Sequence, residues 1–344
     1  MRVALVVPQN ERMLMHRVRG SGVYASNLIK SLRKNYPRDS FFICSSNNIP
    51  DVDIVHYLYF EPFFRTLPII KKNKTVVTVH DLIPFVFPKD FPAGIKGNIN
   101  WFFQRLALKN CDAIITDSDS SKKDILKYTG VKEEKVDVVY LAADTIFKED
   151  KSQNSRIKKK YGLPEKFALY VGDVTWNKNL PRILEAIKDK NIPLVLVGKA
   201  LTREDFDKQN PWNQDLLKVK DFIKDNSKIH VLGFVENNDL VGLYNAATVF
   251  VMPSLYEGFG LPVLEALSCG CPVVTSKAGS IPEVAGDAAY YVDAKNINSI
   301  ANGIEDVYSN DGLMNRLSEK GFLQAKKFSW RKTAELTFKV YQSL

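Results

Sequence analysis

The stretch VFVMPSLYEGFGLPVLEALSCGCPVV, residues 249–274, reads as a strand, a glycine-containing loop, a short helix and a second strand. Residues 249–252 form a continuous apolar run, as in a strand that is buried on both faces of a sheet. Pro262 suits the first position of the helix and Gly270 its end. Units of this kind build parallel, doubly wound α/β sheets.

The same alternation extends along the whole chain. Short runs rich in Val and Ile alternate with longer amphipathic stretches, the pattern of βα units around a buried parallel sheet. Helical pattern fills 22–34 and 97–109, and a serine-rich start at 118–121 opens a helix that runs to residue 128. We expect strands at 2–7, 41–45, 53–57, 75–80, 113–116, 136–140, 167–172, 193–198, 228–232, 248–252, 272–275 and 289–292.

A charged segment divides this series in two. Between Phe147 and Gly162 the sequence EDKSQNSRIKKKY has almost nothing to bury, as expected where a chain leaves one core and enters another. We therefore predict an α/β protein of two doubly wound domains, residues 1–150 and 151–327.

Composition excludes several classes of protein. The chain has 344 residues, 45% of them hydrophobic, so it is too large for one ordinary core and too apolar for disorder. Its four cysteines have no metal-ligand spacing, and no apolar run approaches the ~18 residues of a membrane-spanning helix. Because the N-terminus also lacks a signal-peptide core, we expect a cytoplasmic protein. The net charge of +9 suits binding of anionic small molecules or of an anionic membrane face, but a charge of this size is also common in proteins that simply need to be soluble. Neither half of the chain is a polybasic module of the kind that binds nucleic acid.

The loop and helix of residues 253–270 predict an anion site that also holds two acids. The chain turns through Gly258 and Gly260, and the free N–H groups of the helix start face the carboxyl end of the strand. Glu257 precedes this turn, and Glu265 is expected in the first helical turn. Carboxylates accept hydrogen bonds from vicinal hydroxyls, so a nucleotide sugar satisfies both requirements. The alternative is that Glu265 caps its own helix and Glu257 is solvated.

Four further residues belong with this chemistry. Lys178 follows a strand and precedes a helix opened by Pro181, so its ammonium can pair with a diphosphate, unless it is a lysine in a solvated turn. Gly20 and Gly22 open the first long helix, where glycines allow close approach to a phosphate. His80 ends a buried strand. A histidine in such a place is as often a structural residue with its hydrogen bonds satisfied as it is part of a binding site.

Together these stretches resemble the retaining glycosyltransferases of family 4. The resemblance rests on the Glu-x7-Glu segment with its core EGFGLPVLEAL, on SIPEVAG at 280–286, on GFV at 233–235 and on LYNAA at 243–247. It also includes VGDVTWNKN at 171–179 and VHDL at 79–82, and it covers most of the chain.

This resemblance implies two Rossmann-like domains that face each other across a cleft, the GT-B fold, with the nucleotide on the C-terminal domain. Residues 328–344 would return as a closing helix to the N-terminal domain. Glu257 would contact the donor hexose hydroxyls, Glu265 the ribose, and His80 the hexose. The backbone of Phe259, Gly260 and Leu261 would contact the hexose and phosphate, and the turn at Phe234 and Val235 would border the base. No divalent metal and no cofactor would be used.

We therefore expect an enzyme that moves a hexose from a nucleoside diphosphate sugar to a hydroxyl of a glycan or lipid-linked glycan, with Glu257, His80 and Lys178 as catalytic residues. The loop HDLIP at 80–84, with Pro88, most resembles mannosyltransferases of surface-polysaccharide assembly, which makes GDP-mannose the leading donor. A UDP-sugar is the alternative. The arginine that usually assists the lysine is absent, since Asp173 and Asn177 stand at the two positions where relatives carry it.

Two other signals receive a structural interpretation. Asp117-Ser-Asp119 spells the Asp-x-Asp motif of metal-dependent transferases, but it precedes a serine-rich helix start and is expected to serve capping. The aromatic and basic run 100–109 fits a core-facing helix, and also a helix on the surface of a membrane, where the chain would be peripheral at the inner face.

Three rival functions remain. A dehydrogenase would need a Gly-x-Gly-x-x-Gly turn after its first strand, and neither candidate strand supplies one. A retaining glycosidase would place its two carboxylates along an open groove rather than at a helix terminus. The third possibility, a protein that binds a nucleotide sugar without transferring it, is not excluded, and the acidic Asp173 favours it.

Overall fold

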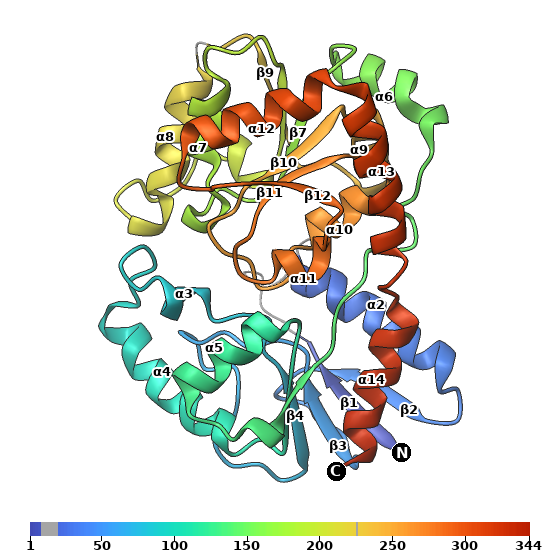
Figure 1. The fold of residues 1–344 in the computed structure, drawn as a ribbon. Helices are drawn as coiled ribbons and strands as arrows, with labels where there is room; N and C mark the ends of the chain where they lie inside the picture. Colours follow the sequence, from blue (N-terminus) through green and yellow to red (C-terminus); the bar gives the residue numbers. More distant parts are fainter. Residues whose placement is uncertain (8–19, 225) are drawn as a thin grey trace. The chain divides into compact units, whose positions relative to one another are not determined.

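The computed structural model describes residues 1–7, 20–224 and 226–344. These residues contain two parallel six-stranded sheets (Figure 1). Each sheet belongs to one compact unit. The first unit comprises Met1–Ala142 with Phe328–Leu344, and the second comprises Ala143–Lys327. The chain thus passes into the second unit ahead of the charged segment at 149–161.

The first sheet has the order β2-β1-β3-β4-β5-β6, so the chain reverses its direction of winding between β1 and β3. Its inner strands are buried apart from the first residues of β1 and β4, as the apolar runs predict. The strands are Arg2–Val6 (β1), Ser40–Cys44 (β2), Ile54–Tyr57 (β3), Lys74–Thr78 (β4), Ala113–Thr116 (β5) and Val136–Val138 (β6).

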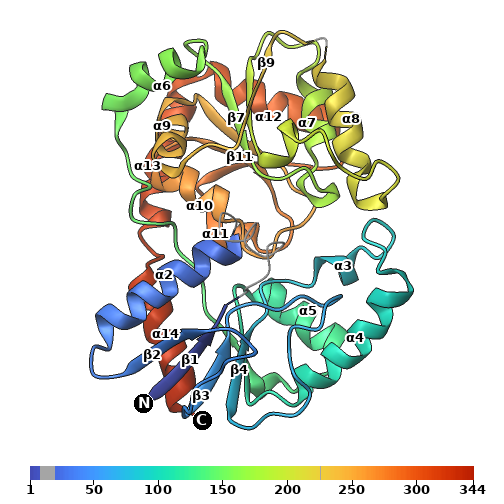
Figure 2. The ribbon, with the colours of Figure 1, turned by 180° about the vertical axis from the view of Figure 1, so that it is seen from behind.

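Helices cover both faces of this sheet: Gly20–Asn35 (α2), Ile83–Val86 (α3), Gly94–Lys109 (α4), Asp119–Thr129 (α5) and Trp330–Gln342 (α14). Figures 1 and 2 show α14 alongside α2. Ser31 donates a hydrogen bond to the backbone oxygen of Trp330 at 2.9 Å, and the rings of Tyr36 and Phe338 stack with centroids 3.7 Å apart. The C-terminal helix therefore returns to the N-terminal unit, which confirms the prediction.

The second sheet has the order β9-β8-β7-β10-β11-β12, read from its β9 edge. Winding runs from β7 outward to β9, then returns to the other side of β7 with β10. The point between β7 and β10 is thus the topological switch point, where doubly wound folds bind ligands. The strands are Ala168–Val171 (β7), Leu194–Val197 (β8), Ile229–Gly233 (β9), Val249–Met252 (β10), Val273–Ser276 (β11) and Ala289–Val292 (β12).

The helices of the second unit pack in two layers against this sheet. Helices α7, α8 and α12 pack together on one face, and α9 and α10 lie on the other. Their residues are Asn154–Tyr161 (α6), Leu180–Ile187 (α7), Gln214–Ile223 (α8), Asn237–Ala246 (α9), Leu261–Ser268 (α10), Ile281–Ala285 (α11), Ile297–Ser309 (α12) and Asp311–Ala325 (α13). The GT-B prediction of two doubly wound α/β units is confirmed.

The cysteines serve packing. Cys111, Cys269 and Cys271 are buried free thiols, so the pair around Gly270 belongs to the core, as its apolar context predicts. Within the described residues, every helix is too short or too polar to span a bilayer.

Candidate functional site

A lysine and a glutamate meet at the switch point of the second sheet. Lys178 ends a short 3₁₀ turn after β7, and Glu257 lies in the loop between β10 and α10. The Lys178 ammonium donates to both carboxylate oxygens of Glu257, at 2.8 and 2.7 Å. Ser254 donates to the same carboxylate at 2.6 Å. Glu257 is only 5% exposed, so its expected alternative, a solvated carboxylate, is wrong.

Backbone hydrogen bonds join the two loops that carry this pair. The Asn177 backbone oxygen accepts from the N–H of Leu255 at 2.7 Å, and its side chain donates to the backbone oxygen of Tyr256 at 3.0 Å. Asn179, in the left-handed conformation with φ of 62°, donates to the backbone oxygen of Pro253 at 2.9 Å. These buried amides hold Lys178 opposite Glu257, so the lysine belongs to a fixed turn and not to a solvated one.

The main chain of Glu257 is fixed from a third direction. Ser280 donates to its backbone oxygen from both the N–H, at 3.2 Å, and the hydroxyl, at 3.0 Å. Gly279 has φ of 59°, and a Cβ there would lie 2.4 Å from the same oxygen. Only glycine fits this position, so Gly279 allows the loop before α11 to pack directly on the backbone of Glu257.

Glu265 lies deeper in α10 than the sequence analysis placed it. The helix begins at Leu261 behind Gly260, whose φ is 96°, and no acidic residue lies in its first turn. The expectation of a first-turn acid, and its alternative of a self-capping glutamate, are therefore wrong. The carboxylate of Glu265 instead accepts a hydrogen bond from the Tyr244 hydroxyl of α9 at 3.0 Å. Burial raises the pKa of Glu265 to about 8, although the bond from Tyr244 opposes this shift.

Glycines bring three strand ends close together beside this pair. Gly172, Gly198 and Gly233 follow or end β7, β8 and β9, and the N–H of Gly198 donates to the oxygen of Gly233 at 2.9 Å. A Cβ on Gly198 would lie 2.2 Å from the backbone oxygen of Gly172. The next two residues, Phe234 and Val235, leave this edge with an exposed and a buried side chain. Their contact with a base stays a prediction.

In the first unit, His80 pairs with Asp117. His80 follows β4 and Asp117 follows the adjacent strand β5, and Nδ1 of the imidazole lies 2.6 Å from Oδ2 of the carboxylate. A carboxylate only accepts, so Nδ1 carries the proton. Burial acts to lower the pKa of His80, but the charge and hydrogen bond of Asp117, together with the charges of Asp81 and Glu61, outweigh burial and the pKa is raised. Among the described residues, the buried Nε2 of His80 and Oδ1 of Asp117 have no hydrogen-bond partner.

This pairing corrects the interpretation of Asp117, whereas the serine-rich start caps α5 as predicted. The cap of α5 is Ser118, whose hydroxyl accepts from the N–H of Ser121 at 3.0 Å. Asp119 lies in the first turn of the helix, where a carboxylate favours the helix dipole. Asp117 does not cap. Within the described ranges, His, Cys, Asp and Glu form no cluster of three or more with metal-binding geometry.

A second polar chain lies behind His80. The Tyr24 ring of α2 meets the His80 imidazole edge-on, with centroids 4.9 Å apart, and the Tyr24 hydroxyl lies 2.8 Å from Oγ1 of Thr78. Thr78 also contacts Nε2 of His56 at 2.9 Å, and Nδ1 of His56 lies 2.6 Å from the Tyr341 hydroxyl of α14. Burial lowers the pKa of His56 to about 3, so this histidine is neutral and structural.

Gly20 and Gly22 lie in the first turn of α2 as the structure describes it. Residues 8–19, between β1 and this helix, are outside the described residues, so the phosphate contact expected of the two glycines stays a prediction.

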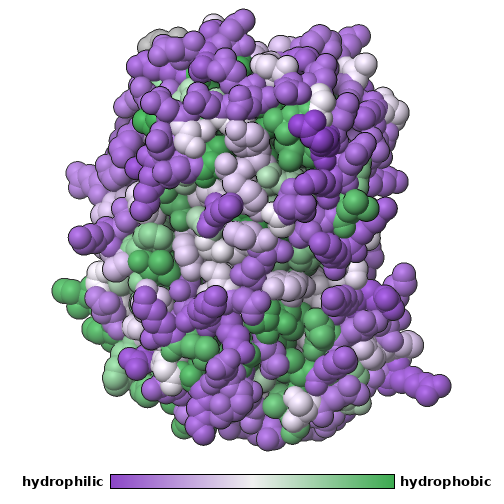
Figure 3. All heavy atoms as spheres, viewed as in Figure 1, coloured by the Kyte–Doolittle hydropathy of each residue, from purple (hydrophilic) through white to green (hydrophobic). Residues whose placement is uncertain are grey.

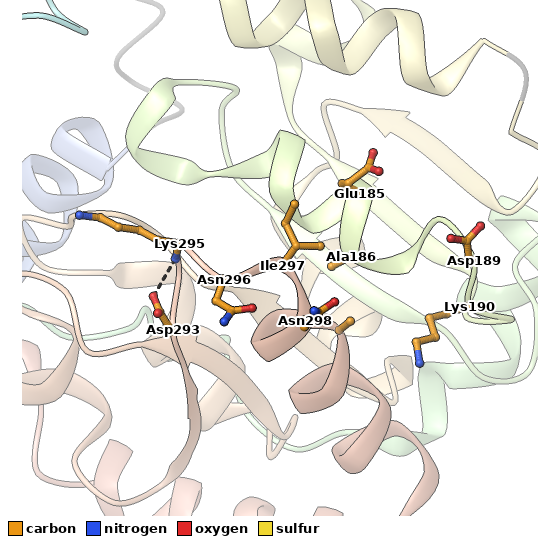
Figure 4. Close-up of a pocket in the computed structure, with 10 residues that line it drawn as sticks. Glu185, Ala186, Asp189, Lys190, Asp293, Lys295, Asn296, Ile297 and Asn298 are labelled. Atoms are coloured by element: carbon orange, nitrogen blue, oxygen red, sulfur yellow. Dashed lines mark hydrogen bonds between the residues drawn. The ribbon is translucent and has the colours of Figure 1, made fainter.

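A separate hollow of about 660 Å³ opens between the end of α7 and the start of α12 (Figure 4). Its charged and polar side chains include Glu185, Asp189 and Lys190 on one side and Asp293 and Lys295 on the other. The Asp293 carboxylate already accepts from the N–H of Lys295 at 2.9 Å. None of the expected site residues lines this hollow.

Several partners of Glu257, Glu265 and His80 are not predicted by the sequence analysis. Ser254 and Tyr244 bind the two glutamates, and Asn177 was considered only as the place of a missing arginine. Glu61, whose pKa burial raises to about 7, also acts on His80 through its charge. Only the position of Ser254, on the same loop as Glu257, offered a sequence signal for any of these contacts.

Comparisons with known proteins bear on both units. Residues 151–324 match the family model described as "Glycosyl transferases group 1", and residues 2–147 match "Glycosyltransferase Family 4". O-antigen chain mannosyltransferase B of Escherichia coli is 31% identical over 303 residues, which cover 85% of this chain and 76% of that protein. Serotype-specific mannosyltransferase WbdA of Escherichia coli is 29% identical over 281 residues, and the match covers 79% of this chain but 34% of WbdA.

The fold has solved counterparts. The structure of Anabaena Alr3699/HepE in complex with UDP-glucose superposes with a TM-score of 0.76 over 100% of this chain and 99% of that one, at 17% identity. At this identity the likeness shows the fold alone. The family models and the relative at 31% identity show more: this chain belongs to the glycosyl transferases group 1 family, with a glycosyltransferase family 4 domain before it, and it is a glycosyltransferase of the GT-B fold.

Proposed function

We propose that this glycosyltransferase moves a hexose from a nucleoside diphosphate sugar to a hydroxyl of a glycan or lipid-linked glycan, with retention of the anomeric configuration. The observation that carries the proposal is the pair of Lys178 and Glu257 at the switch point between β7 and β10. A cation for a diphosphate and an acceptor for sugar hydroxyls stand side by side where doubly wound folds bind ligands.

In this proposal Lys178 and Glu257 bind different parts of the donor, the diphosphate and the hexose. The ammonium of Lys178 has three N–H donors and its contacts with Glu257 use two at most, so a phosphate oxygen can share it. Glu257 then accepts from the hexose hydroxyls, and Ser254 keeps its carboxylate in place. Gly258, Phe259, Gly260 and Leu261 present backbone to the hexose and phosphate.

The proposed reaction exchanges one bond for another at the anomeric carbon. The bond from this carbon to the phosphate oxygen breaks, and a bond to the acceptor oxygen forms on the same face. The acceptor proton passes to the departing phosphate oxygen, so the step needs no separate base. Lys178 and the start of α10 stabilise the negative charge that develops on the diphosphate. Metal ions and cofactors have no part in this scheme.

His80 and Glu265 complete the assignment. Asp117 fixes the Nδ1 proton of His80, which leaves Nε2 for a hexose hydroxyl. Glu265 receives the ribose hydroxyls, and Tyr244 orients its carboxyl group. Gly20 and Gly22 would contact the phosphates.

GDP-mannose is the donor that we infer. Two relatives at 31% and 29% identity are named mannosyltransferases, which supports mannose as the sugar. The turn at Phe234 and Val235, which we assign to the base, offers mainly backbone and therefore discriminates guanine from uracil weakly. A UDP-sugar stays the second candidate, since the HepE counterpart binds UDP-glucose. A lipid-linked acceptor would bring the chain to the inner, anionic face of the cell membrane.

The second candidate function is binding of a nucleotide sugar without transfer, which the acidic Asp173 near the diphosphate position favours. A screen of GDP-, UDP-, ADP- and dTDP-sugars by thermal shift and by donor hydrolysis separates the two. We expect GDP-mannose to raise the melting temperature most and to be hydrolysed slowly without acceptor. Stabilisation with no hydrolysis and no transfer would favour the binding protein, and no stabilisation by any of them would contradict the proposed site.

A further inference from the structure

One face of α4 carries apolar side chains that the core leaves uncovered. Ile95, Ile99, Phe102 and Leu106 follow the spacing of a single helix face, and they are 84%, 51%, 61% and 40% exposed. The opposite face packs inward through buried Gly97, Gln104, Ala107 and Leu108. Figure 3 shows hydrophobic side chains gathered at the edge of the first unit where Figure 1 draws α4.

The loop before α4 extends this apolar row into a groove. Phe64, 56% exposed, and Arg65 join Ile95, Lys96, Ile99 and Asn100 around a hollow of about 650 Å³. The buried side chain of Gln104 accepts from the N–H groups of Thr66 and Leu67, both at 3.1 Å. Because this amide ties the loop to the helix, the groove is formed before any partner arrives.

The two aromatic neighbours of Phe102 have partners of their own, although the ring of Phe103 also meets that of Phe102 edge-on, with centroids 5.5 Å apart. Trp101 packs against Phe85 with centroids 4.1 Å apart, and Arg65 covers the ring of Phe103 at 4.7 Å. The run at 100–109 is thus both a core-facing helix and an uncovered apolar face. The exposed row begins before this run, at Ile95.

The charged residues of the two chain segments that form this face are all basic. Segments 62–72 and 94–109 contain no acidic residue, and their basic residues are Arg65, Lys71, Lys72, Lys96, Arg105 and Lys109. Arg65 and Lys96 border the groove itself. An apolar row flanked by cations is complementary to an anionic lipid surface, because the lipids provide acyl chains for the row and phosphates for the cations.

We propose that the face formed by Phe64, Ile95, Ile99, Phe102 and Leu106 docks on an anionic lipid bilayer, with α4 lying in the plane of the interface. The proposal rests on the proposed function only in that a lipid-linked acceptor would bring the chain to such a surface. Vesicle binding is measured without any glycosyl transfer, so the two proposals can fail separately.

The test is flotation of the full-length chain with vesicles of phosphatidylglycerol and phosphatidylcholine in equal parts. Ile95→Ser/Phe102→Ser removes two exposed apolar side chains without opening the core, and we expect the bound fraction to fall about tenfold. Leu323→Ser is the matched control, since Leu323 is an apolar residue 66% exposed on α13, and its binding should equal that of the wild type. Arg65→Gln/Lys96→Gln should weaken binding and reduce its salt dependence.

Pure phosphatidylcholine vesicles should bind the wild type far less than the mixed ones. Equal binding of wild type and Ile95→Ser/Phe102→Ser, or no binding to the mixed vesicles, would overturn the proposal. So would a concentration-dependent dimer in sedimentation velocity that the same double variant abolishes, because it would assign this face to a second copy of the chain.

Discussion

Lys178 and Glu257 follow neighbouring strands of one sheet, and the lysine nitrogen lies 2.8 and 2.7 Å from the two carboxylate oxygens. The residues stand on opposite sides of the switch point and are 79 positions apart in the chain. Each neutralises the charge of the other. A diphosphate that approaches the lysine therefore also changes the surroundings of the glutamate.

Glu257→Gln should reduce turnover by about 10²-fold or more, because positioning and charge contacts to the donor are lost in the transition state. The amide keeps the volume of the side chain, and its oxygen still accepts from Ser254. Steady-state kinetics with saturating donor provides the measurement, with the exposed Glu319→Gln as control. Turnover within a few-fold of the wild type would remove Glu257 from the site.

Lys178→Ala should weaken binding of the nucleoside diphosphate by ~1.5–3 kcal/mol, on the order of 10- to 150-fold, as for a lost hydrogen bond to a charged group. Lys199 and Arg203 follow β8, the strand next to β7, and are the other cations that could reach the diphosphate. Calorimetric titration should show a smaller loss for Lys199→Ala and Arg203→Ala. A larger loss in Arg203→Ala would mean that this chain has moved its phosphate contact.

The same variant leaves the buried carboxylate of Glu257 without its cation, which should lower the free energy of unfolding by about 1–3 kcal/mol. Lys178→Ala/Glu257→Gln should regain most of this stability and none of the affinity. Chemical denaturation of the single and double variants separates the two effects. If the double variant is no more stable than Lys178→Ala, the ion pair does not explain the loss.

Asp117→Asn should lower the pKa of His80, because the carboxylate that holds the imidazole proton is gone. With its raised pKa, His80 stabilises the fold at low pH, and this contribution fades as the pH rises through that pKa. NMR titration of the imidazole in Asp117→Asn and in the control Asp119→Asn tests the pair. Only the first should shift the His80 signal, and it should also slow transfer. An unchanged titration would show that Asp117 does not govern His80.

Glu265 should make stability depend on pH. Its pKa rises from 4.5 to about 8 on folding, so between these values the native state holds a proton that the unfolded chain has released. Stability therefore falls as the pH rises through this window, by at most about 1.4 kcal/mol per pH unit from this group. Glu265→Gln keeps the bond from Tyr244 and should make the free energy of unfolding less dependent on pH than in the wild type. Parallel curves for both proteins would contradict the raised pKa.

Saturating EDTA should leave transfer unchanged, since the proposed diphosphate contacts are Lys178 and backbone amides. The measurement is the initial rate before and after chelation, with manganese added back. Loss of activity that manganese restores would instead assign a metal to the reaction.

The periodicity of the chain was enough to predict both sheets, because buried parallel strands leave short Val- and Ile-rich runs that differ from the helices between them. It also placed Lys178 and Glu257 after strands. Their contact depends on the order of strands within the sheet, which puts β7 beside β10 and leaves no trace in local sequence. Asp117 was misread for the same reason: its serine-rich neighbours indicate a helix cap, while its true partner follows the adjacent strand.

The central claim is that Lys178 and Glu257 hold a donor sugar that the protein transfers with retention. NMR of the first sugar anomer formed from GDP-mannose, whose mannose is α-linked, tests this most directly. We expect the wild type to yield the α-anomer, in an acceptor product or as free mannose, and Glu257→Gln to yield about 10²-fold less. The β-anomer as first product, or equal rates in the two proteins, would contradict the account.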